Sequence, residues 1–302
     1  MKKRVVIFYH VLYRNDGPPL FWMHNLRQRD DLEVTHLAPQ GDITEYEPFD
    51  IAFWIDYGED GLPVDHDWKI PKSCGKTVYV CSDAHLGRKY RFEKATQFDY
   101  VYFNQKKELE EYQKLYKIYD RRNEVLKWLP HAADEDCYKK SEILKKYDVC
   151  FIGHLQDKKN YNGFSRIDAL DRLFREFPEF YYGTRNPVFP TVNLFEDAAL
   201  KFCQSKIVFN ISIGEDINMR VFEALSTGSM LLTNWIPTLG ELFEDGKHLV
   251  TYKTLDEMVK KARYYLGHED EREKIAETGR QEFLAKHTYK KRIETVLADL
   301  QL

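Results

Sequence analysis

The chain has 302 residues, of which 31% are charged, and a formal net charge of only −4. This length permits a large buried core and two domains, and the nearly balanced charge argues against a general nucleic-acid-binding footprint. No segment approaches the roughly 20 apolar residues of a membrane helix, so we expect no transmembrane segment. Five cysteines without a C-x-x-C pair predict a cytoplasmic protein with neither a disulfide framework nor a zinc site.

The first half alternates short apolar runs with polar segments. Strands are predicted at 4–9, 33–37, 50–55, 77–81, 100–104 and 125–129, and helices at 20–29, 88–97 and 106–119. This alternation is typical of an α/β protein with a parallel, doubly wound sheet.

Two polar residues, Asp83 and His85, follow the apolar strand at 77–81. We expect them at the carboxyl end of that strand, in a cleft between two domains. There they would orient an acceptor hydroxyl, and either is a candidate general base. The alternative is that they form a helix cap or a local hydrogen-bonding device.

The alternation restarts after a charged stretch with little β character. Strands are predicted at 148–153, 180–183, 206–212 and 229–233, and helices at 165–176, 194–203, 239–243, 255–266, 269–286 and 289–300. We therefore predict two Rossmann-like domains, at 1–132 and 133–288, followed by a final helical segment at 289–302.

The most informative stretch is residues 214–228, between the strands at 206–212 and 229–233. In parallel sheets, ligands bind at the carboxyl ends of the strands. Asn218 is a plausible N-cap, which leaves backbone N–H groups and the positive helix end to meet an anion, with Gly214 in the loop before it. Arg220 adds a planar, permanently charged fork for phosphate oxygens.

Two glutamates, Glu215 and Glu223, flank this arginine. An ionised carboxylate accepts several hydrogen bonds and donates none, so it suits the hydroxyls of a ribose or a sugar. Two acids and a cation together predict a nucleotide-sugar site. The alternative is that Glu215 and Asp216 merely complement the helix dipole.

The spacing of Glu215 and Glu223 resembles the two-glutamate motif of GT-B glycosyltransferases. The block RVFEALSTG at 220–228 is similar to the signature of the CgeB-like family, named after a spore maturation protein. Weaker similarities lie in the same order at 82–85, 98–106, 128–134, 149–153, 276–280 and 286–292.

This resemblance implies two Rossmann-like domains that face a cleft, with the last helix returning to the first domain. The N-terminal domain would hold the acceptor and the C-terminal domain the nucleotide-diphosphate sugar. Glu223 would accept hydrogen bonds from the ribose, Glu215 would position the sugar, and Arg220 would neutralise the diphosphate. The same resemblance points to Asp83 and His85.

Three further residues are candidates for donor binding. Arg166 matches an arginine in the similar CgeB-like segment and offers a cation near the diphosphate. His131 either contacts the donor or packs between the domains. Trp235 either forms an aromatic wall of the donor cavity or anchors a loop.

We predict a glycosyltransferase of the hexosyltransferase type. It would need no cofactor other than the nucleotide-diphosphate sugar that is its donor substrate. Its acceptor would be a glycan, a protein or another molecule with a hydroxyl group. No Asp-x-Asp pair follows a strand, and Asp65-His66-Asp67 lies far from the motif, so no metal ion is expected. The two-glutamate motif resembles retaining transferases, which favours retention.

Two alternatives stay open. The chain is short for a GT-B enzyme, and residues 15–19 replace the glycine-rich loop expected after the first strand. These departures suit a non-catalytic nucleotide-sugar-binding or assembly protein. A nucleotide-sugar epimerase of the same architecture is the other alternative.

Overall fold

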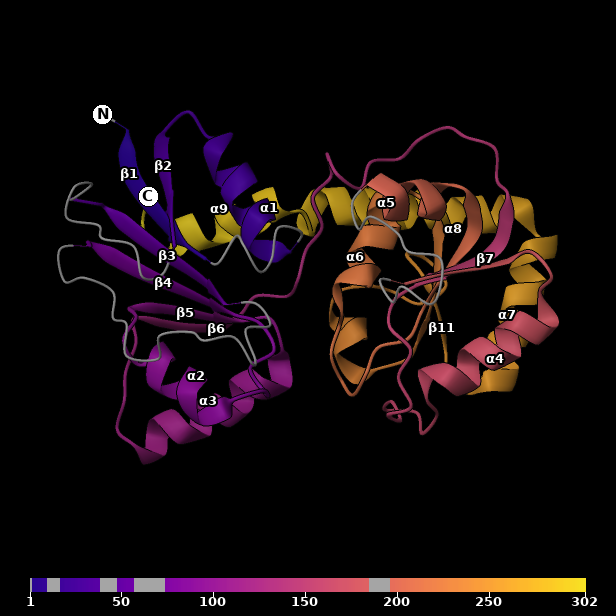
Figure 1. The fold of residues 1–302 in the computed structure, drawn as a ribbon, viewed down its shortest axis with the longest axis horizontal. Coiled ribbons are helices and arrows are strands. Elements are labelled where there is room, and N and C mark those ends of the chain that lie inside the picture. The colour runs from indigo at the N-terminus through magenta and orange to yellow at the C-terminus, as the bar shows by residue number, and fades with distance from the viewer. Residues whose placement is uncertain (1, 10–16, 39–47, 57–73, 185–195) are drawn as a thin grey trace. The chain divides into compact units, whose positions relative to one another are not determined.

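The computed structural model describes residues 2–9, 17–38, 48–56, 74–184 and 196–302. The chain divides into two compact units, each with its own sheet (Figure 1). Unit 1 comprises Met1–Pro130 and Tyr289–Leu302, and unit 2 comprises His131–Thr288. The Asp65-His66-Asp67 segment and most of the loop expected after the first strand lie outside the described residues.

Unit 1 holds a six-stranded sheet in the order β2-β1-β3-β4-β5-β6. All five strand pairs are parallel, which confirms the predicted doubly wound sheet. The strands are β1 (Lys3–Phe8), β2 (Leu32–Leu37), β3 (Ile51–Asp56), β4 (Lys76–Cys81), β5 (Tyr100–Phe103) and β6 (Val125–Trp128). The central strands β3 and β5 are buried along their whole length, as continuous apolar runs require.

Helices cover both faces of this sheet (Figure 1). Helix α1 (Pro18–Arg27) packs with α9 (Tyr289–Asp299), and α2 (Arg88–Ala95) and α3 (Lys106–Ile118) lie on the other face. Helix α9 therefore returns to the first domain, as the resemblance implied. The ring centroids of Phe21 and Tyr289 lie 5.2 Å apart, and Arg292 Nε donates to the Pro130 carbonyl at 2.8 Å.

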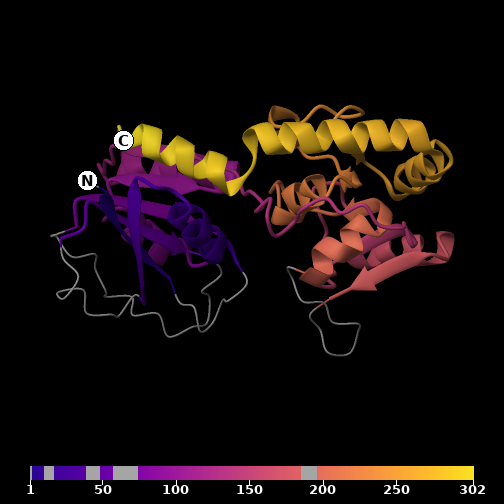
Figure 2. The same ribbon diagram turned by 90° about the horizontal axis from the view of Figure 1, so that it is seen from above.

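Unit 2 holds a second parallel sheet, in the order β11-β10-β9-β7-β8. Its strands are β7 (Tyr147–Ile152), β8 (Phe180–Gly183), β9 (Ser205–Asn210), β10 (Met230–Asn234) and β11 (Val250–Tyr252). Helix α4 (Arg166–Glu176) packs against α7 (Leu255–Gly267), and α5 (Glu196–Cys203) packs against α6 (Met219–Ser226). Helix α8 (Glu269–Lys286) contacts α6 and β10 and ends before α9 begins (Figure 2).

The strand order of each sheet reverses at one point. In unit 2, β7 leads outward to β8, whereas β9 leads to β10 and β11 on the other side. The carboxyl ends of β7 and β9 therefore flank a topological switch point, where open α/β sheets bind their ligands. In unit 1 the reversal lies between β1 and β3. The residues that follow these two strands, 10–16 and 57–73, lie outside the described part of the chain.

Three local predictions differ from the structure. Strand β11 was not predicted, because three residues are too few for a periodic pattern. The helix predicted at 239–243 is a 3-10 helix, η1 (Pro237–Glu241). Strand β9 ends at Asn210 instead of reaching 212, since the Ser212 N–H donates to the Asn234 side chain at 2.7 Å.

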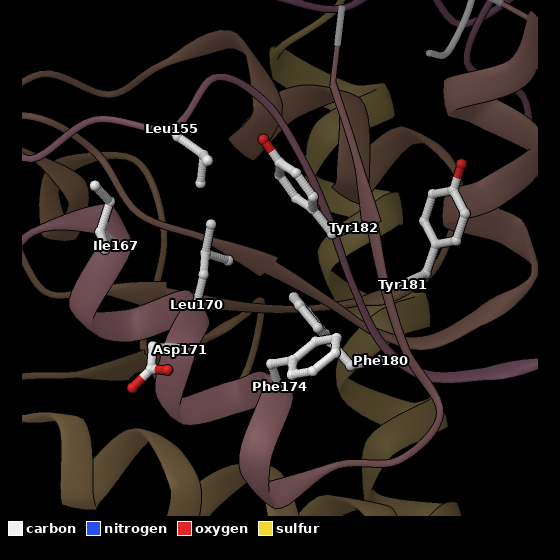
Figure 3. Close-up of a pocket in the computed structure, with 8 residues that line it drawn as sticks. All are labelled: Leu155, Ile167, Leu170, Asp171, Phe174, Phe180, Tyr181 and Tyr182. Atoms are coloured by element: carbon white, nitrogen blue, oxygen red, sulfur yellow. The ribbon is translucent and has the colours of Figure 1, made fainter. Parts of the chain in front are cut away.

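A groove of about 570 Å³ lies on the flank of unit 2 (Figure 3). Side chains from α4 and from the edge strand β8 face one another across it. Its lining is apolar or aromatic apart from Asp171. Such a lining offers no cation to a phosphate group. Among the described residues, no helix combines the length and the apolar character needed to cross a membrane.

Candidate functional site at the switch point of unit 2

The loops that follow β7 and β9 are joined by Arg166, the first residue of α4. Its Nε and Nη2 donate to the Ile211 carbonyl at 3.3 and 3.2 Å, and its Nη1 donates to the His154 carbonyl at 3.2 Å. The side chain is buried, and the helix around it is fixed by a capping box between Ser165 and Asp168. Arg166 thus braces the two loops at the switch point, and its predicted contact with the donor stays a prediction.

A second guanidinium group, from Arg220, lies beside the first. Both stack on Phe151, with guanidinium carbons 4.9 Å (Arg220) and 5.8 Å (Arg166) from the ring centroid. Burial, and then the charge of Arg220, lower the pKa of Arg166 to about 10. Two like charges near each other in a partly desolvated site favour an anion that bridges them.

The N-terminus of α6 points to the same switch point. Asn218 occupies the N-cap position with extended backbone angles, as predicted, but its side chain makes no capping hydrogen bond. Its Nδ2 instead donates to Asn210 Oδ1 at 3.1 Å, at the end of β9. The side-chain amide of Asn218 is thus engaged with β9 and not with the N–H groups at the positive end of the helix.

Near this helix end, buried side-chain amides and hydroxyls are hydrogen-bonded to one another. Asn210 Nδ2 donates to Thr233 Oγ1 at 3.0 Å, and Asn234 Nδ2 donates to Asn162 Oδ1 at 3.2 Å. These bonds tie the ends of β9 and β10 to the loop that follows β7. A network of this kind holds a polar site rigid.

Glu223 lies one turn beyond Arg220 on α6 and is half-buried. Its carboxylate accepts a hydrogen bond from the hydroxyl of Tyr138, a buried residue from the segment before β7. The charge of Arg220 also acts on that tyrosine hydroxyl. Glu223 and Arg220 therefore share one neighbourhood, as their spacing on the helix predicted.

Glu215 and Gly214 lie in the loop between β9 and α6. Gly214 has a φ of +65° and is exposed, so this turn needs a residue that tolerates the left-handed region. The Glu215 carbonyl accepts a hydrogen bond from Thr238 Oγ1 at 3.0 Å, which fixes the loop to η1.

Trp235 and His131 are both half-buried. The ring centroids of Trp235 and Tyr161 lie 5.7 Å apart, and Lys253 Nζ lies over the Trp235 ring, 4.4 Å from its centroid. It thus anchors two loops of unit 2 in a small aromatic and cationic cluster. His131 is the first residue of unit 2, directly after Pro130.

In unit 1, Asp83 and His85 follow β4, as predicted. Asp83 has a φ of +50°, a left-handed conformation that is rare for a residue other than glycine and is enriched at functional sites. The Ala84 N–H donates to Gln105 Oε1 at 3.0 Å, which turns Gln105 Nε2 toward His85 Nδ1 at 3.2 Å. His85 Nδ1 also lies 3.5 Å from Gln105 Oε1, so Gln105 contacts this ring nitrogen through both atoms of its amide.

Two residues of the unit 2 site, Phe151 and Tyr138, were not predicted. Phe151 lies in an apolar strand, and from the sequence it cannot be told apart from a phenylalanine of the hydrophobic core. Tyr138 lies in a charged stretch with no strand or helix pattern. Neither position carries a signal in the sequence alone.

Part of the chain matches a known family model, and the whole chain matches solved structures. Residues 178–298 match a family model described as glycosyl transferase-like. The fold resembles Anabaena HepE in complex with UDP and glucose, with a TM-score of 0.68, 13% identity and 99% coverage of both chains. The chain has the GT-B fold.

Two further GT-B structures give similar values. Sucrose-phosphate synthase from Thermosynechococcus elongatus has a TM-score of 0.67, 8% identity and 99% coverage of both chains. Trehalose 6-phosphate synthase from Burkholderia multivorans has a TM-score of 0.61 and 12% identity, covering 100% of this chain and 98% of the other. The sequence matches none of the curated proteins. The matched segment contains helix α6, which carries Arg220 and Glu223.

Proposed function

We propose that this GT-B protein moves a sugar from a nucleotide-diphosphate sugar to an acceptor hydroxyl, as a member of the CgeB-like subfamily. The observation that carries the proposal is the pair of guanidinium groups, Arg166 and Arg220, on one ring at the switch point of unit 2. Two guanidinium groups at one place match the charge and the planar hydrogen-bonding geometry of the two phosphate groups of a diphosphate. The N-terminus of α6, which follows β9 at this switch point, adds a positive dipole end to the same place.

Each side chain has a role that follows from its chemistry. Arg220 stabilises the departing diphosphate as the glycosidic bond breaks, because charge develops on its oxygens. Glu223 accepts hydrogen bonds from the ribose, and Glu215 accepts them from the transferred sugar. In unit 1, Asp83 and His85 are both candidates to receive the acceptor proton. That both units meet at one cleft stays a prediction.

The two cations support transfer without a metal ion, since they already supply the charge that a divalent cation would bring to the diphosphate. The two-glutamate spacing supports retention of configuration. HepE has been solved with UDP and with UDP-glucose, so uridine nucleotides head the panel of donors. Five free cysteines, four of them buried, support a reducing, cytoplasmic location.

The function is tested by incubating the protein with UDP-, GDP-, ADP-, CDP- and dTDP-linked hexoses in the presence of EDTA. We expect slow release of the nucleoside diphosphate from one donor, faster with an acceptor. In Arg220→Gln the rate should fall by roughly 10²–10³-fold, as for the loss of a transition-state charge partner. Binding without release would indicate a non-catalytic protein, and isomerised donor would indicate an epimerase.

The position of the Arg220 guanidinium is tested by Gly153→Ala. A Cβ at Gly153 would lie 2.9 Å from Arg220 Nη2 and 3.1 Å from Phe151 Cζ. The flexible end of Arg220 must then move, whereas the backbone need not. Affinity for the preferred nucleoside diphosphate, measured by calorimetry, should fall by roughly tenfold, as for a lost charged hydrogen bond.

Two comparisons make this measurement specific. Affinity for the matching nucleoside, which has no phosphate, should be unchanged in Gly153→Ala. Gly240→Ala adds a methyl group that meets no atom within 4 Å, so it should bind like the wild type. Equal losses for nucleoside and nucleoside diphosphate would contradict a phosphate role for Arg220.

A further inference from the structure

Tyr138 lies in a turn that is built around Asp134. The buried Asp134 carboxylate accepts hydrogen bonds from the backbone N–H groups of Asp136 and Cys137, at 3.0 and 2.9 Å. The Asp134 carbonyl accepts the Tyr138 N–H at 2.9 Å. This turn, just inside the start of unit 2, fixes the backbone from which the Tyr138 ring projects.

The same tyrosine is attached to α6 at two points. Its carbonyl accepts a hydrogen bond from Ser226 Oγ at 2.7 Å, and its hydroxyl donates to the Glu223 carboxylate. The side chain is 2% exposed, so it has one packed position. Burial, then the charge of Glu223, raise the pKa of Tyr138 well above its ordinary value, so the hydroxyl stays a donor at all working pH values.

We propose that Tyr138 is the positioning residue that sets Glu223 for the ribose. This rests on the proposed function, in which Glu223 accepts the ribose hydroxyls. A carboxylate on a helix surface samples several rotamers, and ordering it on binding costs affinity. The Tyr138 hydroxyl holds one carboxylate oxygen in place before the nucleotide arrives and leaves the group its remaining lone pairs for the diol.

Tyr138→Phe removes the hydroxyl and keeps the ring, so it tests this role directly. The probe is whichever of UDP, GDP, ADP, CDP and dTDP binds the wild type most tightly. We expect its affinity to fall by about tenfold, the order of a charged hydrogen bond lost. We also expect the pH at which binding is half-lost in acid to move upward, because a hydrogen bond to a charged form favours that form.

Ser226→Ala is the matched control, since it removes the other bond to Tyr138 without touching Glu223. It should lower the melting temperature about as much as Tyr138→Phe, and leave nucleotide affinity and its pH profile unchanged. In a Glu223→Gln background, Tyr138→Phe should cause less than about a twofold further loss, because coupled residues are not additive.

The outcomes separate the two proposals. Unchanged affinity and pH profile in Tyr138→Phe, with weak binding in Glu223→Gln, would overturn the positioning role alone. Unchanged affinity in both variants would instead remove Glu223 from the nucleotide site and end the proposed function in this form. Equal affinity losses in Tyr138→Phe and Ser226→Ala would show that Tyr138 only packs.

Discussion

Replacing Glu223 with glutamine is expected to weaken nucleoside diphosphate binding by roughly 10- to 100-fold, the range of a charged hydrogen bond. Glutamine keeps the shape and length of the side chain, and removes its negative charge. Its amide nitrogen can no longer accept a hydrogen bond, so one ribose hydroxyl or the Tyr138 hydroxyl loses its acceptor. Isothermal calorimetry with the preferred nucleoside diphosphate measures the loss.

The same titration with Glu142→Gln gives the control. Glu142 is exposed on the segment before β7. Its substitution by glutamine changes the net charge of unit 2 by the same amount as Glu223→Gln does. Its affinity should equal that of the wild type at ordinary salt, since surface charges at a distance are screened. A Glu223→Gln protein that binds as tightly as Glu142→Gln would remove Glu223 from the site.

Gly279→Ala is expected to cause the largest loss of stability among single methyl additions in unit 2. Gly279 is buried in α8, and a Cβ there would lie 2.0 Å from the His248 carbonyl oxygen and 2.8 Å from Leu225 Cδ2. The carbonyl belongs to a hydrogen-bonded turn, in which Gly246 N donates to Leu249 O at 2.8 Å. Backbone in such a turn cannot yield as a side chain does, so the helix itself must shift.

We expect Gly279→Ala to cost about 3 kcal/mol, at the upper end for overpacking. For a domain of this size that corresponds to a fall in melting temperature of roughly 6–12 °C. Gly267→Ala, at the end of α7, meets no atom within 4 Å. It should be neutral or stabilise by up to about 1 kcal/mol. Equal melting temperatures in the two variants would contradict the close approach of α8 to the His248 carbonyl.

Much of the fold could be predicted from the sequence because the strands are central and parallel. A strand buried on both faces is a continuous apolar run, as in β3, and such runs stand out between polar helices. Short elements at the sheet edge lack that signal. Strand β11 has only three residues. The 3-10 helix η1 begins with a proline, a residue that is also common at the start of an α-helix.

The candidate site was predictable only where its residues lie on one short segment. Arg220 and Glu223 share helix α6, so their spacing alone places them together. Tyr138 reaches the same helix from far along the chain, through a bond to Ser226 that spans 88 residues. The bracing of two loops by Arg166 likewise depends on backbone carbonyls, which no residue type reveals.

Keeping Arg166 and Arg220 on a single aromatic ring has a consequence for the resting protein. Burial, and then the charge of Arg220, lower the pKa of Arg166, so the folded protein holds this cation less favourably than water does. A ligand that binds only the folded state raises its stability by mass action, so we expect a nucleoside diphosphate at this place to raise the melting temperature of the domain.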